Sequence, residues 1–177
     1  MSSRRKFVIT GIALATSTTG CMGVLENNDE ERQELYDEVL ETYEGGETEF
    51  NNAIDDFERG EELFREDSYS DAERYFRDAK RGFDSAVDSF SDAKRLIREL
   101  EELNSVVGDA EEIIDESWNN AISFSSSAQF HRQAAEMAPD TEAGAQAQFD
   151  AGQQTIEEEG YSRTVTSGSA LLSEFSE

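Results

Sequence analysis

Residues 71–105 read DAERYFR DAKRGFD SAVDSFS DAKRLIR ELEELNS when they are written in groups of seven. Small or aliphatic residues fill the second position of each group, and aromatic or aliphatic residues fill the sixth position of the first four. These residues are Ala72, Ala79, Ala86, Ala93 and Leu100, and Phe76, Phe83, Phe90 and Ile97. Spacings of four and three place all of them on one side of an α-helix. The stretch therefore predicts a long helix with one buried stripe, against which a second helix can pack closely.

The preceding segment carries the complementary pattern. Aromatic residues recur there every seven positions, with small residues between them: Tyr36, Tyr43, Phe50, Phe57 and Phe64 alternate with Val39, Gly46, Ala53 and Gly60. We predict one helix over residues 29–66, with a candidate kink at Gly45-Gly46, because glycine weakens a helix by about 1 kcal/mol relative to alanine. The polar residues 65–70 predict a reversal of the chain. Ser70 is expected to cap the next helix, with Glu73 completing a capping box.

Two further helices are predicted after this hairpin. Residues 109–138 carry Ile114, Ala121, Ala128 and Ala135 at intervals of seven, and Pro139 is expected to end that helix. Asp140 is expected to cap a fourth helix that runs to Gly160. Short connections between long amphipathic helices imply antiparallel neighbours. The predicted fold is all-α, an antiparallel four-helix bundle of long helices, with a weakly helical tail.

The chain begins with a short leader. Arg4 and Arg5 precede an apolar stretch that starts at Phe7 and is too short for a membrane span, which needs about 20 apolar residues. The only cysteine, Cys21, follows this stretch, so no intrachain disulfide can form. Positive charge, a short apolar core and small residues before a cleavage point are typical of an export signal.

Two short motifs in the leader resemble known signals. Residues 3–7 (SRRKF) resemble a twin-arginine (Tat) export signal, and residues 18–21 (TTGC) resemble a lipobox, with Thr18 where that family usually has leucine. The resemblance implies cleavage before Cys21, a lipid on its sulfur, and attachment at the extracytoplasmic face of the cell membrane. The alternative is a signal peptide without lipid, in which Cys21 is an incidental small residue.

These observations predict four parts. Residues 1–20 are the signal peptide, residues 21–28 a lipidated, extended tether, residues 29–160 the helical bundle and residues 161–177 a C-terminal tail that can hold a short helix. Together they describe a chain whose body lies close to a membrane without crossing it.

The chain is strongly acidic. It has 41 acidic and 15 basic residues, for a formal net charge of −26. An acidic chain with so little lysine resembles proteins of extremely halophilic archaea, and molar salt would screen its self-repulsion over about 3 Å. Nucleic-acid binding requires a basic face, so nucleic acid is excluded as a partner. The aromatic content argues against the alternative of an acidic disordered chain.

Residues 60–79 resemble one tetratricopeptide (TPR) repeat. Gly60, Tyr69, Ala72, Phe76 and Ala79 match that family's spacing, whereas the expected proline near residue 84 is missing. Counted with the positions that depart from the pattern, from near Asp56 to near Asp84, the match covers about 30 residues, and no second copy follows, while such arrays need about three repeats for stability. We interpret it as a TPR-like hairpin in the first half of the bundle, and keep a TPR-like adaptor that binds a partner's peptide as an alternative.

No motif for catalysis, cofactor binding or metal binding is recognisable. The single histidine, His131, has no glutamate three residues before it, which argues against a carboxylate-bridged di-iron centre. We expect His131 to be a packed, hydrogen-bonded residue. We therefore predict no enzymatic activity, no catalytic residue, no metal site and no cofactor. A small-molecule or metal-dependent activity around His131 remains a further alternative.

The favoured hypothesis is a non-enzymatic, lipid-anchored cell-envelope protein that acts as a helical binding or spacing module. Its partners would be the membrane, through a lipid on Cys21, and a protein that the sequence does not identify. The long stripes of alanine and phenylalanine can also close by homodimerisation.

Overall fold

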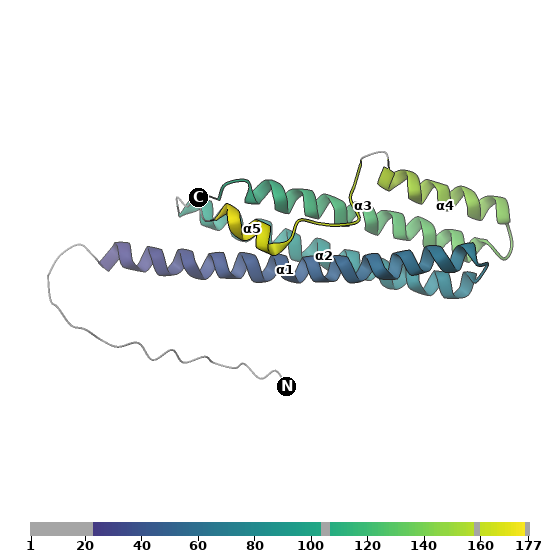
Figure 1. Ribbon diagram of the computed structural model, residues 1–177, viewed down its shortest axis with the longest axis horizontal. Helices are drawn as coiled ribbons and strands as arrows, with labels where there is room; N and C mark the ends of the chain where they lie inside the picture. The colour runs from purple at the N-terminus through teal and green to yellow at the C-terminus, as the bar shows by residue number, and fades with distance from the viewer. Residues whose placement is uncertain (1–22, 104–106, 158–159, 176–177) are drawn as a thin grey trace, which may run out of the picture.

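The computed structural model describes residues 23–103, 107–157 and 160–175, and all regular structure in this part of the chain is helical. The helices are α1 (Gly23–Arg65), α2 (Tyr69–Glu102), α3 (Ala110–Met137), α4 (Glu142–Glu157) and α5 (Gly168–Glu174). The all-α class and the helical bundle predicted from the sequence are confirmed. Figure 1 shows α1, α2 and α3 running side by side along the length of the molecule.

The α1–α2 hairpin forms where the two sevenfold patterns face each other. Every predicted stripe residue of α2 is buried, as are Tyr43, Phe50, Phe57 and Phe64 of α1. Glycines make room for the rings: a Cβ at Gly46 would lie 2.8 Å from Phe90, and one at Gly60 would lie 2.7 Å from Phe76. Large rings therefore fit into notches on the opposite helix, which is the close packing that protein interiors require.

Helix α3 completes the aromatic core. The ring of Phe124 lies 5.6 Å from Phe50 of α1, 5.9 Å from Phe57 of α1 and 5.4 Å from Phe83 of α2, measured between centroids. The four predicted stripe residues of α3 are also buried. Elsewhere on this helix, Ile122 is exposed, whereas Trp118 is partly buried against the core, with the Nζ atom of Lys94 5.6 Å from its ring centroid.

Two short elements share the fourth position of the bundle. Helix α4 packs on α3 at the end where the α1–α2 and α3–α4 turns lie, which we call the tip. Helix α5 packs on α1 and α3 toward the opposite end, which we call the base (Figure 1). We call residues 160–167, which lead from α4 to α5, the strap. The fourth long helix that the sequence predicted is thus a 16-residue helix, and the C-terminal tail fills the rest.

Several predicted boundaries are corrected. Helix α1 begins at Gly23 rather than at residue 29, so residues 23–28 of the predicted extended tether are helical, and the helix continues through Gly45-Gly46. Helix α2 begins one residue before Ser70, with Ser68 at the cap position and no side-chain capping bond. Helix α4 begins two residues after Asp140. Within the described residues, no helix is long and apolar enough to cross a membrane.

Candidate functional site

The residues predicted to direct export and lipid attachment, namely Arg4, Arg5, Phe7 and Cys21, lie outside the described residues. Their predicted roles therefore remain predictions. One neighbouring feature is visible: α1 starts at Gly23, two residues after Cys21, and it is the longest helix of the structure. The helix that follows the predicted attachment point in the sequence thus begins at the base of the bundle.

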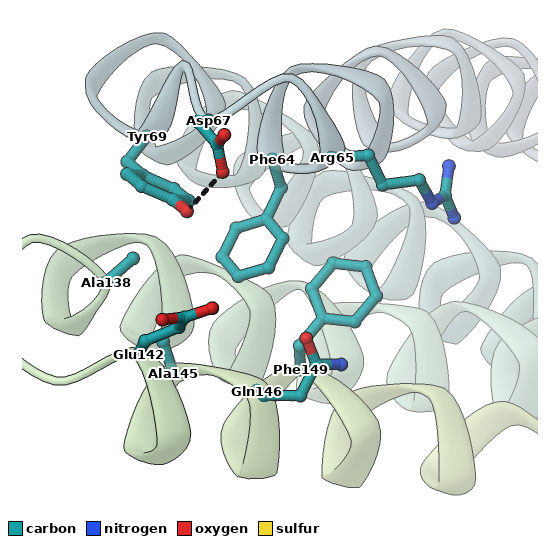
Figure 2. A pocket seen from close by; sticks show the side chains of 9 residues that line it. All are labelled: Phe64, Arg65, Asp67, Tyr69, Ala138, Glu142, Ala145, Gln146 and Phe149. Carbon is teal, nitrogen blue, oxygen red and sulfur yellow. Dashed lines mark hydrogen bonds between the residues drawn. The ribbon is translucent and has the colours of Figure 1, made fainter.

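A pocket of about 290 Å³ lies at the other end, the tip. Its walls come from the α1–α2 turn on one side and from the start of α4 on the other (Figure 2). The rings of Phe64, Tyr69 and Phe149 contribute apolar surface, and Asp67 and Glu142 contribute carboxylates. Concave sites that combine aromatic surface with a few convergent polar groups are the usual form of small-molecule sites.

The backbone of the α1–α2 turn sets the position of these groups. Asp67 has a φ of 59°, in the left-handed region, where aspartate is tolerated better than most residues. The amide of Ser68 donates to the carbonyl of Leu63 at 2.9 Å, and the amide of Asp67 donates to that of Phe64 at 3.2 Å. These two bonds form a Schellman ending for α1. The turn therefore fixes Phe64, Asp67 and Tyr69 relative to one another.

The aromatic rings of the pocket are held by direct contacts. Phe64 stacks on Phe149 with centroids 4.6 Å apart and planes 19° apart, and Tyr69 meets Phe64 edge to face at 5.3 Å. The hydroxyl of Tyr69 donates to Oδ1 of Asp67 at 2.6 Å. This hydrogen bond, with burial and the nearby charges of Asp67 and Glu142, raises the pKa of Tyr69. Tyr69 is thus held as a neutral ring against the pocket.

The charged groups around the pocket differ in direction. The guanidinium of Arg65 points away from the rings of Tyr69 and Phe64, and lies 3.5 Å from the carboxylate of Glu61 (Figure 2). The carboxylate of Glu142 is directed toward the space between those rings. Among the residues that the structure describes, Glu142 forms no ion pair or side-chain hydrogen bond. The inner side of the pocket is therefore acidic and aromatic.

A buried polar cluster lies directly behind Phe149. His131, which has no exposed surface, lies 4.3 Å from the Phe149 ring between centroids and also touches the rings of Phe57 and Phe76. Its Nδ1 atom donates a hydrogen bond to the carbonyl of Ser127 at 2.8 Å. Its Nε2 atom accepts from the side-chain amide of Gln153 at 3.1 Å. Both ring nitrogens are therefore satisfied with the imidazole neutral.

A buried carboxylate connects this cluster to the strap. Glu61, only 4% exposed, accepts hydrogen bonds from Gln153 and, at 3.4 Å, from Arg163 of the strap. Arg163 also donates to Glu58 at 3.0 Å. Paired and hydrogen-bonded in this way, a buried carboxylate avoids the large penalty of an isolated charge. The cluster thus fastens α4 and the strap to α1.

The environment of His131 determines what it can do chemically. Burial lowers its pKa from 6.5 to about 4, despite the opposing effects of its bond to Ser127 and of the Glu61 charge. A catalytic acid or base must lie within hydrogen-bonding reach of a substrate. His131 is enclosed by rings and bonded at both nitrogens, which argues against the alternative of an activity centred on it. Within the described ranges, no group of three or more histidine, cysteine or acidic side chains is placed to hold a metal ion.

A TPR-like adaptor needs a concave face with exposed polar and aromatic residues, and burial of Tyr69, Phe76 and Phe83 against neighbouring helices counts against it. Phe76 and Phe83 are fully buried in the core, and Tyr69 is partly buried at the pocket. Two of these three rings are thus committed to holding the helices together, which counts against a peptide-binding groove formed by them.

Sequence reasoning did not identify most of this site. Tyr69 and Phe64 were recognised as a turn aromatic and a stripe aromatic, whereas Phe149, Glu61 and Gln153 were not singled out. Phe149 is the single aromatic residue of α4, among alanines and glutamines, which is a signal that a close reading could use. Glu61 lies among other acids of α1, so the sequence offers nothing to separate it from exposed ones.

Comparison with known proteins provides no relative to guide the assignment. No protein-family model, no curated protein and no solved structure matches the chain.

Proposed function

We propose that the protein is a non-enzymatic, lipid-anchored binding module of the cell envelope, which holds the pocket at its tip away from the membrane. The observation that carries this proposal is the position of Cys21, immediately before the helix that extends from the base toward the tip. The leader motifs supply the export route and the lipid. The pocket supplies a place for a ligand at the end opposite the anchor.

The length of α1 gives the scale of this arrangement. Its 43 residues span about 65 Å at a rise of about 1.5 Å per residue. Because the helix starts two residues after Cys21, little free chain separates the anchor from the bundle. A lipid at Cys21 would therefore hold the base at the membrane and the pocket several tens of ångströms from it.

The charge of the chain is consistent with contact through the lipid alone. Cleavage before Cys21 would remove Arg4, Arg5 and Lys6 and no acidic residue. The cleaved chain would then have all 41 acidic residues and 12 of the 15 basic residues. Anionic headgroups repel such a body. The same excess of charge predicts that the bundle loses its helical circular dichroism signal on transfer from molar salt to dilute buffer, where screening is weak. An unchanged signal would contradict the halophilic part of the proposal.

The anchor can be tested by fractionating cells that express the full chain or a Cys21→Ser variant. We expect the wild-type protein in the membrane fraction and the variant in the soluble, exported fraction. Met22→Leu is the matched control, because it changes the neighbouring residue and keeps the sulfur, and it should fractionate as wild type. A Cys21→Ser protein that stays on the membrane would overturn lipid attachment at this residue.

The export route needs a separate test. A chain with both Arg4→Lys and Arg5→Lys keeps the charge of the leader and removes the arginine pair. We expect it to accumulate inside the cell with its leader attached, whereas Lys6→Arg should be exported as wild type. Normal export of the double variant would exclude the twin-arginine route and leave the anchor to be judged by the Cys21 experiment.

A further inference from the structure

The pocket at the tip combines two features that favour the same kind of ligand. Its apolar surface is aromatic, and aromatic faces carry negative electrostatic potential that attracts cations. The carboxylate of Glu142, an exposed side chain on the α4 wall of the pocket, lies on the side of Tyr69 and Phe64, and no cation of the described residues pairs with it. The guanidinium of Arg65, which also lines the pocket, is turned toward Glu61 instead.

We propose that this pocket binds a small organic cation, specifically an ammonium group carrying methyl groups. This inference rests on the proposed function, since it names the ligand class of that binding module. The methyl groups would contact the partly buried ring of Tyr69 beside the stacked pair of Phe64 and Phe149, and the charge would lie near the carboxylate of Glu142. Aromatic surface and a carboxylate together recognise such ions, because a methylated ammonium is both apolar and charged.

Other ligand classes fit the pocket less well. An anion would meet the carboxylates of Asp67 and Glu142 together with ring faces that repel negative charge. A metal ion would find only those two carboxylates on separate elements, and one of them already accepts the hydroxyl of Tyr69 at 2.6 Å. The volume of about 290 Å³ lies at the lower limit for drug-sized ligands, about 300–1,000 Å³, which favours a small ligand.

The salt conditions inferred from the acidic composition also favour this class. Molar salt screens the attraction between separated charges, so a carboxylate alone would select weakly between an organic cation and Na⁺ or K⁺. Contact between methyl groups and aromatic rings depends on burial of apolar surface and is not weakened in this way. The rings would therefore provide the selectivity, and Glu142 would add to the affinity.

The test is calorimetric titration of the full chain, purified in detergent and molar KCl, with choline and with its neutral carbon analogue 3,3-dimethyl-1-butanol. The two probes have nearly the same shape and differ in charge. We expect choline to bind about tenfold more tightly, which corresponds to about 1.4 kcal/mol. Equal affinity for both probes, or no measurable binding of choline, would overturn the proposal.

Matched variants assign the binding to this pocket. Tyr69→Leu removes the ring and should weaken choline about fivefold, whereas Tyr69→Phe keeps the ring and should bind within about twofold of wild type. Glu142→Gln should weaken choline by a similar factor, and Asp88→Asn, the same charge change at an exposed position of α2, should not. Circular dichroism of each variant shows whether it is folded. Choline binding unaffected by both Tyr69→Leu and Glu142→Gln would place the cation elsewhere and overturn the proposal.

The two proposals fail in different experiments. Absence of choline binding would remove the ligand class and leave the membrane anchor intact, because the anchor is judged by fractionation of the Cys21→Ser variant. Conversely, a Cys21→Ser protein that stays on the membrane would not change a titration performed on the purified chain.

Discussion

The tip and the base of the bundle use the same three helices but complete them differently. At the tip, α4 adds Phe149, which packs against Phe64 and His131. Toward the base, the strap and the seven residues of α5 take this place, with Tyr36 against Phe175 at 4.8 Å. The stacked ring of Phe149 thus completes the tip, whereas the buried Leu171, the partly buried Phe175 and hydrogen bonds to the strap complete the half nearer the base.

Tyr43 illustrates how the base half is held. Its hydroxyl donates to the carbonyl of Thr166 in the strap at 2.7 Å and lies 2.7 Å from Oγ of Ser117. Burial raises its pKa to about 12, so the hydroxyl keeps its proton and the bond to the strap. A hydrogen bond of this kind contributes about 1 kcal/mol, less than a fully buried ring. The comparison therefore predicts that the tip half contributes more to stability.

The largest expected effect is the loss of a ring from the tip half. Phe57 is fully buried among Phe76, Phe83 and His131, so Phe57→Ala should reduce the free energy of unfolding by about 3–5 kcal/mol. Phe175 at the base is partly buried, and Phe175→Ala should cost about 1 kcal/mol. Denaturant unfolding in molar salt measures both. Equal losses would show that the two halves are equivalent.

The next effect is the pH dependence of stability that arises from His131 at the tip. The unfolded chain takes up a proton on His131 as the pH falls below 6.5, whereas the folded chain does so only near its pKa of about 4. The stability associated with the neutral ring is thus present above pH 6.5 and is lost progressively as the pH falls to 4, by about 3 kcal/mol in total.

His131→Gln provides the control for this effect. The variant keeps all carboxylates, so its change in unfolding free energy between pH 6.5 and 4 reports every other titrating group. Wild type should lose more stability than the variant over this range when both are unfolded by denaturant in molar salt. Parallel pH profiles would mean that His131 is not buried as a neutral ring.

A smaller effect is expected where the strap meets the tip. Arg163→Met removes a cation from the buried carboxylate of Glu61, leaves Arg65 at 3.5 Å, and should cost about 2 kcal/mol. Glu61→Gln in the same chain removes the uncompensated charge and should recover part of this loss. A double variant less stable than Arg163→Met alone would show that Glu61 contributes through other contacts.

The smallest expected effect comes from glycine-to-alanine substitutions at two positions, one tightly packed and one open. A Cβ at Gly152 in α4 would lie 2.5 Å from Cε1 of His131, whereas one at Gly45 in α1 would have no neighbour within 4 Å. Gly152→Ala should therefore destabilise the bundle by about 1–2 kcal/mol despite its better helix propensity. Gly45→Ala should stabilise it by about 0.5–1 kcal/mol, as thermal unfolding will show. The same sign for both would contradict the close packing of α4 on His131.

The sequence predicts well what is local and repetitive. Sevenfold spacing predicted the buried faces of α1, α2 and α3, because apolar residues recur every seven positions along most of each helix. It was less informative about helix ends: Ser70 matched the capping pattern, but the chain places Ser68 at the start of α2. Single residues at boundaries are decided by the geometry of the turn, here the left-handed Asp67.

The candidate site depends on contacts that no local pattern contains. Phe64 and Phe149 belong to α1 and α4, and Arg163 reaches Glu61 across 102 positions of the sequence. Such pairs depend on which segment packs at the fourth position of the bundle. The sevenfold repeats of α1, α2 and α3 do not determine that segment, so they do not predict that α4 and the C-terminal tail share this position.

The most direct test of the account is mass spectrometry of the intact protein isolated from its native cells. The account predicts a chain that begins at Cys21, carries a diacylglyceryl group on its sulfur, and is recovered with the membranes. An unmodified chain that begins at Met1 and is recovered from the soluble interior of the cell would contradict it.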